Sequence, residues 1–300
     1  MTAPPALGLP VALGDVPAAE WAAAIVVRHS ARTFTGDAVD PAKLQRLELL
    51  CEGLPAPEVA RVVLVRQVPD LVFTGFVGSY GRVLRAPSAL LMVATESAPS
   101  CQESAGYLGE AAILHATSLG LGTCWIAGFF DRAVASTLVP LAPGERVLAI
   151  SPLGLAEPRA RAGERMMKRM VGAHSRKPVE DVAPGFDPES WPAWAAEGVR
   201  LARVAPSAVN RQPWRFELGQ SASVSGLSGT DIRPERAVTI SAVTKGKEGS
   251  ISRRLDCGIA MLHFEVGARI MGASGRWESL PDPDVARYKV VDTAGDPFGA

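Results

Sequence analysis

The sequence predicts an α+β protein assembled from two related halves. Two observations support this fold class. Helical and strand-like patterns are mixed along the whole chain, and landmarks recur after about 152 positions. With 47% of its 300 residues hydrophobic, the chain can also bury a large core. The length alone fits one large domain or two small ones. We expect a first half at 17–184 and a second at 185–300, packed as one globular unit.

The first half begins with a helix in which Trp21 and Ile25 share one face, being spaced i, i+4. A second helix should start at Pro41, because Asp40 can cap it and proline suits the first helical position. The remaining elements follow from apolar runs and helical periodicity. In full, the first half is expected to contain helices at 18–27, 41–51 and 104–119 and strands at 62–66, 89–94 and 147–153.

The second half shows a similar mixture. Its long helix carries one apolar stripe at steps of three and four, formed by Leu255, Ile259, Leu262, Val266 and Ile270. Before it we expect a helix at 188–204, a strand at 214–218, a polar loop at 219–230 and a strand at 237–242, and after it a strand at 288–291.

An internal repeat relates the two halves. At a shift of about 152 positions, Trp125 coincides with Trp277, and the strand-like run 62–65 coincides with 214–217. The sequence Ala-x-Leu-His at 112–115 recurs 148 positions later, which predicts that one half has gained about one helical turn. Glycines in both long helices suit an interface between the halves. The alternative is that alanine-rich helices resemble one another through composition alone.

Composition excludes several classes of function. Lys and Arg together number 31, as do Asp and Glu, so no net positive field favours nucleic acid or a membrane surface. No segment reaches the roughly 18 apolar residues of a membrane span, and the proline-rich 1–16 does not fit a signal peptide, so we expect a cytoplasmic protein. The chain contains no CxxC pair, so we expect no zinc site. The scattered cysteines should be small buried hydrophobes, although disulfides remain open: Cys51, Cys101, Cys124 and Cys257.

Two stretches carry chemistry-bearing side chains. In an extended segment Arg28, Ser30 and Arg32 would share one face, and these three donors suit a phosphate and an electron-rich ring edge. The alternative is an ordinary basic helix terminus. In the second stretch, Pro206 and Pro213 brace a turn whose side-chain amides could match a flat heteroaromatic edge. The alternative is a rigid turn with polar side chains on the surface. Those polar residues are Ser207, Asn210 and Gln212.

A third stretch, 120–129, is rich in glycine and would allow close backbone approach, or it is a helix end leading into a turn. Together these motifs resemble the FMN-dependent nitroreductase family, in particular its branch with two family-like halves in one chain. The motif Arg-x-Ser-x-Arg is met by Arg28, Ser30 and Arg32, and Pro-Ser-x-x-Asn-x-Gln-Pro-Trp by 206–214. Weaker matches are Ala127, Gly128 and Phe129 in a Gly-Phe loop, and Ser175, Arg176 and Pro178 in a Ser-Arg-x-Pro tail.

The resemblance implies FMN at an interface, with the Arg/Ser motif from one side and the Pro-Ser-x-x-Asn motif from the other. Each half of this chain holds the motif that the other lacks. At the shift of about 152, Ser207 and Asn210 fall on Pro55 and Glu58, while Arg28 falls on Glu180. We therefore expect an intrachain pseudo-dimer with one site able to bind flavin, acting as a monomer.

The resemblance also implies residue roles. The phosphate and ribityl chain would contact Arg28, Ser30 and Arg176, with His29 contributing through its backbone. His174 stands where family members often have a basic residue, and it departs from that pattern. The isoalloxazine would meet Arg32 at its N1/O2 edge and a backbone N–H of Ala127 or Gly128 at N5. From the other half would come Asn210 and Gln212, with Pro206 and Ser207 shaping the wall and Trp214 anchoring the core.

The implied activity is electron transfer from NADH or NADPH to a nitroaromatic, quinone or similar small acceptor, by a ping-pong cycle at the flavin. No side chain is expected to act as acid, base or nucleophile, since the flavin carries the chemistry. Without a Gly-x-Gly-x-x-Gly motif after a strand, the nicotinamide would dock directly over the flavin. The alternatives are an FMN-binding protein without reductase activity, such as a reservoir or scaffold, and a specialised flavoenzyme. Substrate contacts are expected on the loops 73–80 and 219–230.

Overall fold

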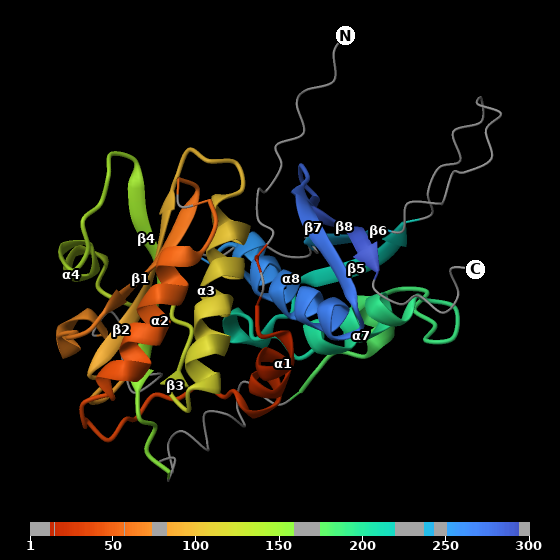
Figure 1. Cartoon of the computed structure of the whole chain (residues 1–300). Helices are drawn as coiled ribbons and strands as arrows, with labels where there is room; N and C mark the ends of the chain where they lie inside the picture. The colour runs from red at the N-terminus through yellow and green to blue at the C-terminus, as the bar shows by residue number, and fades with distance from the viewer. Residues whose placement is uncertain are drawn as a thin grey trace.

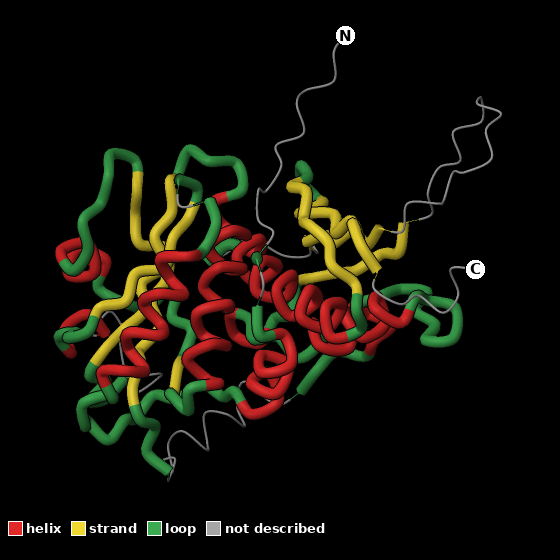
Figure 2. The backbone as a smooth tube through the Cα atoms, in the orientation of Figure 1, coloured by secondary structure: helices red, strands yellow, loops and turns green. Residues whose placement is uncertain are grey.

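The computed structural model describes residues 13–14, 16–56, 58–73, 83–158, 175–219, 237–242 and 251–293. Two groups of helices and strands lie side by side (Figures 1 and 2). The first comprises α1 Ala18–Val27, α2 Pro41–Gly53, β1 Ala60–Val65, η1 Asp70–Phe73, β2 Ser88–Thr95, α3 Cys101–Ser118, β3 Gly122–Thr123, α4 Arg132–Thr137 and β4 Glu145–Gly154. The second comprises α6 Val179–Val182, α7 Ala193–Ala202, η2 Ala208–Asn210, β5 Trp214–Gly219, β6 Ala237–Ala242, α8 Arg253–Ile270, β7 Ala273–Ser279 and β8 Asp284–Thr293.

Each group contains an antiparallel four-stranded sheet, and the two sheets have the same strand order. The first runs β1-β2-β4-β3 and the second β5-β6-β8-β7. In the chain, α3 joins β2 to β3 and α8 joins β6 to β7. The pairing of the two central strands is interrupted once in each sheet, after Met92 in the first and after Ile240 in the second. The α+β fold predicted from sequence is thus confirmed, and it is consistent with two related halves.

The long helices α3 and α8 lie between the sheets and pack against each other (Figure 1). Close approach depends on two glycines. A Cβ on Gly106 would lie 2.1 Å from the carbonyl oxygen of Leu255, and one on Gly258 would lie 2.0 Å from that of Glu103. Gly106 and Gly258 are 152 positions apart, as are Glu103 and Leu255. The contact is therefore reciprocal, as at the interface of a symmetric dimer.

This reciprocity corrects one expectation from the sequence. The Ala-x-Leu-His match at a shift of 148 does not align equivalent residues, because α3 and α8 both have 18 residues and cross at a shift of 152. The interrupted ladders, by contrast, are 148 positions apart. The additional residues therefore lie in the connection from β6 to α8, and neither helix has gained a turn.

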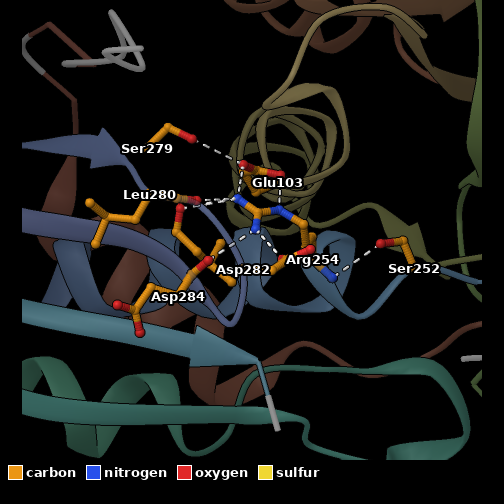
Figure 3. Close-up of polar contacts among 8 residues, drawn as sticks. Glu103, Ser252, Arg254, Ser279, Leu280, Asp282 and Asp284 are labelled. Atoms are coloured by element: carbon orange, nitrogen blue, oxygen red, sulfur yellow. Dashed lines mark hydrogen bonds and ion pairs between the residues drawn. The ribbon is translucent and has the colours of Figure 1, made fainter. Parts of the chain in front are cut away.

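A buried ion pair fastens α8 to α3 near their crossing (Figure 3). Arg254 donates to both carboxylate oxygens of Glu103, at 3.0 and 2.7 Å. The same guanidinium donates to Asp282 at 2.7 Å and to the Leu280 carbonyl at 3.0 Å, while Ser279 donates to Glu103 at 3.3 Å. The Glu103 carboxylate is fully buried. This network ties both long helices to the turn between β7 and β8.

Most expected elements are present with small changes at their ends. The helix expected from position 188 begins only at Ala193, because Pro192 directly precedes it. Strand β7 was not expected, since its glycine and serines are unusual in strands. Trp214 is fully buried, which confirms its expected role as a core anchor. All four cysteines are free and buried.

Candidate functional site

A cleft with a cavity volume of about 150 Å³ opens where the two halves meet. The first half lines it with Ser30, Arg32 and the loop 125–129 that follows α3 and β3. The second half lines it with the turn 206–209 and the first residues of α8, including Leu255 and Asp256. Segments far apart in sequence thus form one concave surface, which is the usual character of a ligand site.

Alternation along the segment after α1 directs two polar side chains to this cleft. Ala31 donates its N–H to the Thr123 carbonyl at 2.9 Å, and Ser30 pairs with Thr123 as an isolated bridge. Ala31 and Thr33 are buried, whereas Ser30 and Arg32 are partly exposed and line the cleft. The extended conformation predicted for this segment is confirmed here.

Arg28 and His29 do not line the cleft. The Arg28 side chain is 9% exposed, and its Nε lies 3.9 Å from Oε1 of Glu110 on α3. Its Nη1 is buried and has no hydrogen-bond partner within the described part of the chain. His29 is exposed, and its Nδ1 lies 3.4 Å from the Val27 carbonyl oxygen.

Behind the cleft, Glu110 joins several buried groups. Trp125, which lines the cleft, donates its indole N–H to Oε2 of Glu110 at 2.6 Å. The other oxygen, Oε1, lies 2.9 Å from Nε2 of His263 on α8, and Nδ1 of His263 lies 3.1 Å from the Leu201 carbonyl. Glu110 and His263 are buried. A cleft residue is thus held by a polar pair that bridges the two long helices.

The turn that forms the opposite wall has a strained backbone. Val209, Asn210 and Gln212 have φ angles of 46°, 56° and 45°, in the left-handed region that residues other than glycine rarely adopt. Asn210 donates its N–H to the Ser207 carbonyl at 3.0 Å, and the Gln212 N–H reaches Oγ of Ser207 at 2.9 Å. Such a conformation persists only where surrounding contacts hold it.

One of those contacts comes from α8. Asp256 accepts the N–H of Ala208 at 3.0 Å and Nε of Arg211 at 2.6 Å. Burial raises the pKa of the Asp256 carboxyl to about 6, against the opposing charge of Arg211. Asp256 also lines the cleft, so it places a titratable group on the cleft surface while it fixes the wall.

The second support comes from the segment 175–178. Asn210 donates to the Ser175 carbonyl at 2.9 Å and accepts from Nη1 of Arg176 at 3.0 Å. Gln212 accepts the N–H of Lys177 at 3.0 Å through its side-chain oxygen. The two amides therefore face this segment. Burial lowers the pKa of Arg176, and the positive charges of Arg28 and Arg203 lower it further.

The residues predicted from sequence thus fall into three groups. Those that line the cleft are Ser30, Arg32, Ala127, Gly128, Pro206 and Ser207. Those linked beside or behind it are Arg28, Arg176, Asn210 and Gln212. His29 stands apart from both groups. The expected position of His174, and nearly all of the loops 73–80 and 219–230, lie outside the described residues.

Sequence reasoning missed four residues of the site: Glu110, Trp125 as a cleft residue, Asp256 and His263. A signal was available for three of them, because Glu110, Asp256 and His263 are polar residues inside otherwise apolar helices. Such residues need a buried partner, which the sequence does not identify.

No cluster of His, Cys, Asp or Glu suitable for a metal ion occurs in the ranges that the structure describes. Nor does any described helix combine the length and apolar character needed to cross a membrane.

Comparisons with known proteins agree with this architecture. A family model described as "Putative TM nitroreductase" matches residues 20–268. A "putative nitroreductase" of solved structure from Thermotoga maritima is 20% identical with a TM-score of 0.56, over 94% of this chain and 98% of that one. No curated protein matches.

Two other solved structures cover about half of this chain. A nitroreductase family protein from Clostridium difficile 630 is 17% identical with a TM-score of 0.41, over 56% of this chain and 98% of that one. An FMN-dependent nitroreductase from Clostridium difficile R20291 is 18% identical with a TM-score of 0.39, over 49% and 94%. Since the family model spans most of the sequence and the Thermotoga structure shares its fold, this chain belongs to that nitroreductase family.

Proposed function

We propose that this protein is an FMN-dependent oxidoreductase that passes electrons from NADH or NADPH to a nitroaromatic, quinone or similar small acceptor. The observation that carries the proposal is the cleft between the halves. It sets Ser30 and Arg32 of one motif opposite Pro206 and Ser207 of the other. Family membership supplies the reaction class, and these motifs support the choice of cofactor.

The charges and donors around the cleft fit an FMN phosphate. Arg28 has a buried Nη1 without a hydrogen-bond partner in the described ranges, and a buried donor of this kind calls for an acceptor. The charge of Arg28 also lowers the pKa of Arg176, so like charges lie close together there. An anion would relieve that repulsion. We assign the phosphate to Arg28 and Arg176, with Ser30 beside the ribityl chain.

The ring would occupy the cleft itself. Arg32 would place a fixed cation against its N1/O2 edge. The backbone N–H of Ala127 or Gly128, both of which line the cleft, would serve N5. The cavity of about 150 Å³ is smaller than the roughly 300–1,000 Å³ of whole ligand pockets, so it would enclose only part of FMN.

FMN, when bound, would supply the hydride and electron chemistry, and the protein residues would bind and orient it. Because both motifs lie in one chain, we propose a monomer with one FMN. A cytoplasmic location, where NADH and NADPH are available, goes with this proposal.

The proposal is tested by titrating the purified chain with FMN and then adding NADH or NADPH without oxygen. We expect one FMN per chain, rapid bleaching of the flavin colour, and reoxidation by a nitroaromatic or a quinone. Absence of FMN binding would reject the proposal. Binding without bleaching by either nicotinamide would favour the alternative, an FMN-binding protein without this reductase activity.

Solution mass tests the monomer. We expect particles of about 31.5 kDa, because the interface between the two halves would be internal to this chain. Two FMN per chain would contradict the single site.

A further inference from the structure

We propose that His263 is a positioning residue that neutralises the charge of Glu110, so that Glu110 does not cancel the positive charge that Arg28 offers to the phosphate of FMN. This inference rests on the proposed function. It concerns a polar pair buried in the core, outside the set of residues assigned from the sequence motifs.

The starting point is a buried carboxylate close to the arginine. Oε1 of Glu110 lies 3.9 Å from Nε of Arg28, and the Glu110 side chain is fully buried. Two opposite charges in the interior attract strongly. If Glu110 and Arg28 were the only charges there, they would cancel, and the site would attract a phosphate weakly.

His263 changes that charge balance. Its Nδ1 lies 3.1 Å from the Leu201 carbonyl oxygen, which can only accept, so Nδ1 carries a proton. Its Nε2 lies 2.9 Å from Oε1 of Glu110, and a proton must lie between these atoms because two facing acceptors would repel. That proton belongs either to a histidinium beside a carboxylate or to a carboxylic acid beside a neutral histidine. In both forms the pair has no net charge.

Arg28 therefore contributes one positive charge that the Glu110–His263 pair does not cancel. Its Nη1 is buried without a hydrogen-bond partner in the described ranges, and its field acts on Arg176. Oε2 of Glu110 meanwhile accepts the Trp125 indole at 2.6 Å. Glu110 can thus hold Arg28 and a cleft residue in place without cancelling the charge of Arg28.

A second buried carboxylate on the same pair of helices shows the opposite arrangement. Glu265 accepts from Tyr107 and from the indole of Trp277 at 3.1 Å, as Glu110 accepts from Trp125. Its partner, however, is Arg269, whose Nε lies 2.9 Å away. No histidine is among the partners of Glu265 in the described part of the chain, so there the acid and the arginine neutralise each other.

The experiment compares FMN with riboflavin, which has the same ring but no phosphate. In the full chain, His263→Gln keeps a donor toward Glu110 but cannot carry a positive charge, so Glu110 would then neutralise Arg28. We expect the preference for FMN over riboflavin, measured as the ratio of their dissociation constants, to fall about tenfold. Riboflavin affinity itself should change little.

A double variant supplies the rescue. In His263→Gln with Glu110→Gln the pair is neutral again, so the preference for FMN should return toward the wild-type ratio. The matched control is Glu265→Gln, which alters an equally buried carboxylate away from the cleft and should leave the ratio unchanged. Circular dichroism would show that each variant is folded.

The outcomes separate this inference from the proposed function. If the wild-type chain binds no FMN, the proposed function fails. If it binds FMN but His263→Gln leaves the ratio unchanged, or the double variant loses as much of the preference as the single one, then the charge-balancing role of His263 is wrong.

Discussion

Two equivalent places flank the crossing of α3 and α8: one is the cleft, and at the other an ion pair holds the described counterparts of the cleft residues. Sheet pairing establishes the equivalence. The two sheets have the same strand order, so Thr123, which pairs with Leu153, corresponds to Gly275, which pairs with Val290. Thr123 and Gly275 are 152 positions apart. The cleft loop 127–128 therefore corresponds to Ser279 and Leu280, and the cleft residue Leu255 corresponds to Glu103.

At the second place those counterparts are bound to Arg254. Its guanidinium contacts Glu103 and Leu280, and Glu103 also accepts from Ser279 (Figure 3). In the open cleft, the corresponding positions are held by Ala127, Gly128 and Leu255, which carry no charge. The same pair of crossed helices thus borders a cleft on one side and an ionic anchor on the other. The comparison predicts different effects of substitution on the two sides.

The largest expected effect is on stability at the anchored side. Arg254→Ala would leave the Glu103 carboxylate buried without its main partner, and breaking such a pair costs about 3–5 kcal/mol. Urea unfolding followed by circular dichroism measures the change, with the exposed Arg287→Ala as control, for which we expect less than about 0.5 kcal/mol. A loss below about 1 kcal/mol would show that the anchor contributes little.

The next effect concerns pH at the open side. Burial raises the pKa of Asp256 to about 6, whereas an unfolded Asp titrates near 3.9. Between these values the folded chain binds a proton that the unfolded chain does not. This contribution to stability is present at low pH and lost as pH rises through about 6, by roughly 3 kcal/mol.

Asp256→Asn removes this titration. The unfolding free energy of the wild type, relative to that of the variant, should therefore fall between pH 4 and pH 7. The equivalent residue across the crossing is Ser104, which carries no charge at either pH. A constant difference across this range would contradict the raised pKa.

The sequence could predict the parts of this comparison that depend on local patterns. Periodicity places most helices and strands, alternation directs Ser30 and Arg32 to one face, and the repeat of about 152 positions matches the crossing of the helices. Strand β7 was not predicted because Ser274, Gly275 and Ser279 lack strand propensity. Its pairing with β8 decides its structure.

Contacts between distant residues could not be predicted. His263 and Glu110 are 153 positions apart, and Arg254 and Glu103 are 151 apart. Each residue reads as an isolated polar group in an apolar helix, and only the packing of α3 against α8 pairs them. The amides of Asn210 and Gln212 show the same limit, since their partners at 175–177 are distant in sequence.

A smaller effect is expected at the open cleft itself. Arg32→Ala should weaken FMN binding by about tenfold to a hundredfold, the range for a lost hydrogen bond to a charged group, and leave unfolding stability nearly unchanged. Asn210→Ala should weaken it too, because Asn210 holds Arg176. Fluorescence titration gives the dissociation constants, and the exposed Arg215→Ala on β5 is the control. Unchanged FMN affinity in both variants would reject the site assignment.

The smallest effect tests strain in the cleft wall. Val209 has a φ of 46° and is 67% exposed, so Val209→Gly would relieve backbone strain while losing little packing. We expect the flavin-free chain to gain about 0.5–1 kcal/mol of unfolding free energy, because the relief exceeds the added flexibility of glycine in the unfolded chain. Val291 is 66% exposed but lies in strand β8, so Val291→Gly should lose stability instead. If both variants lose stability alike, the turn is not strained, and its left-handed backbone would not distinguish the open side from the anchored one.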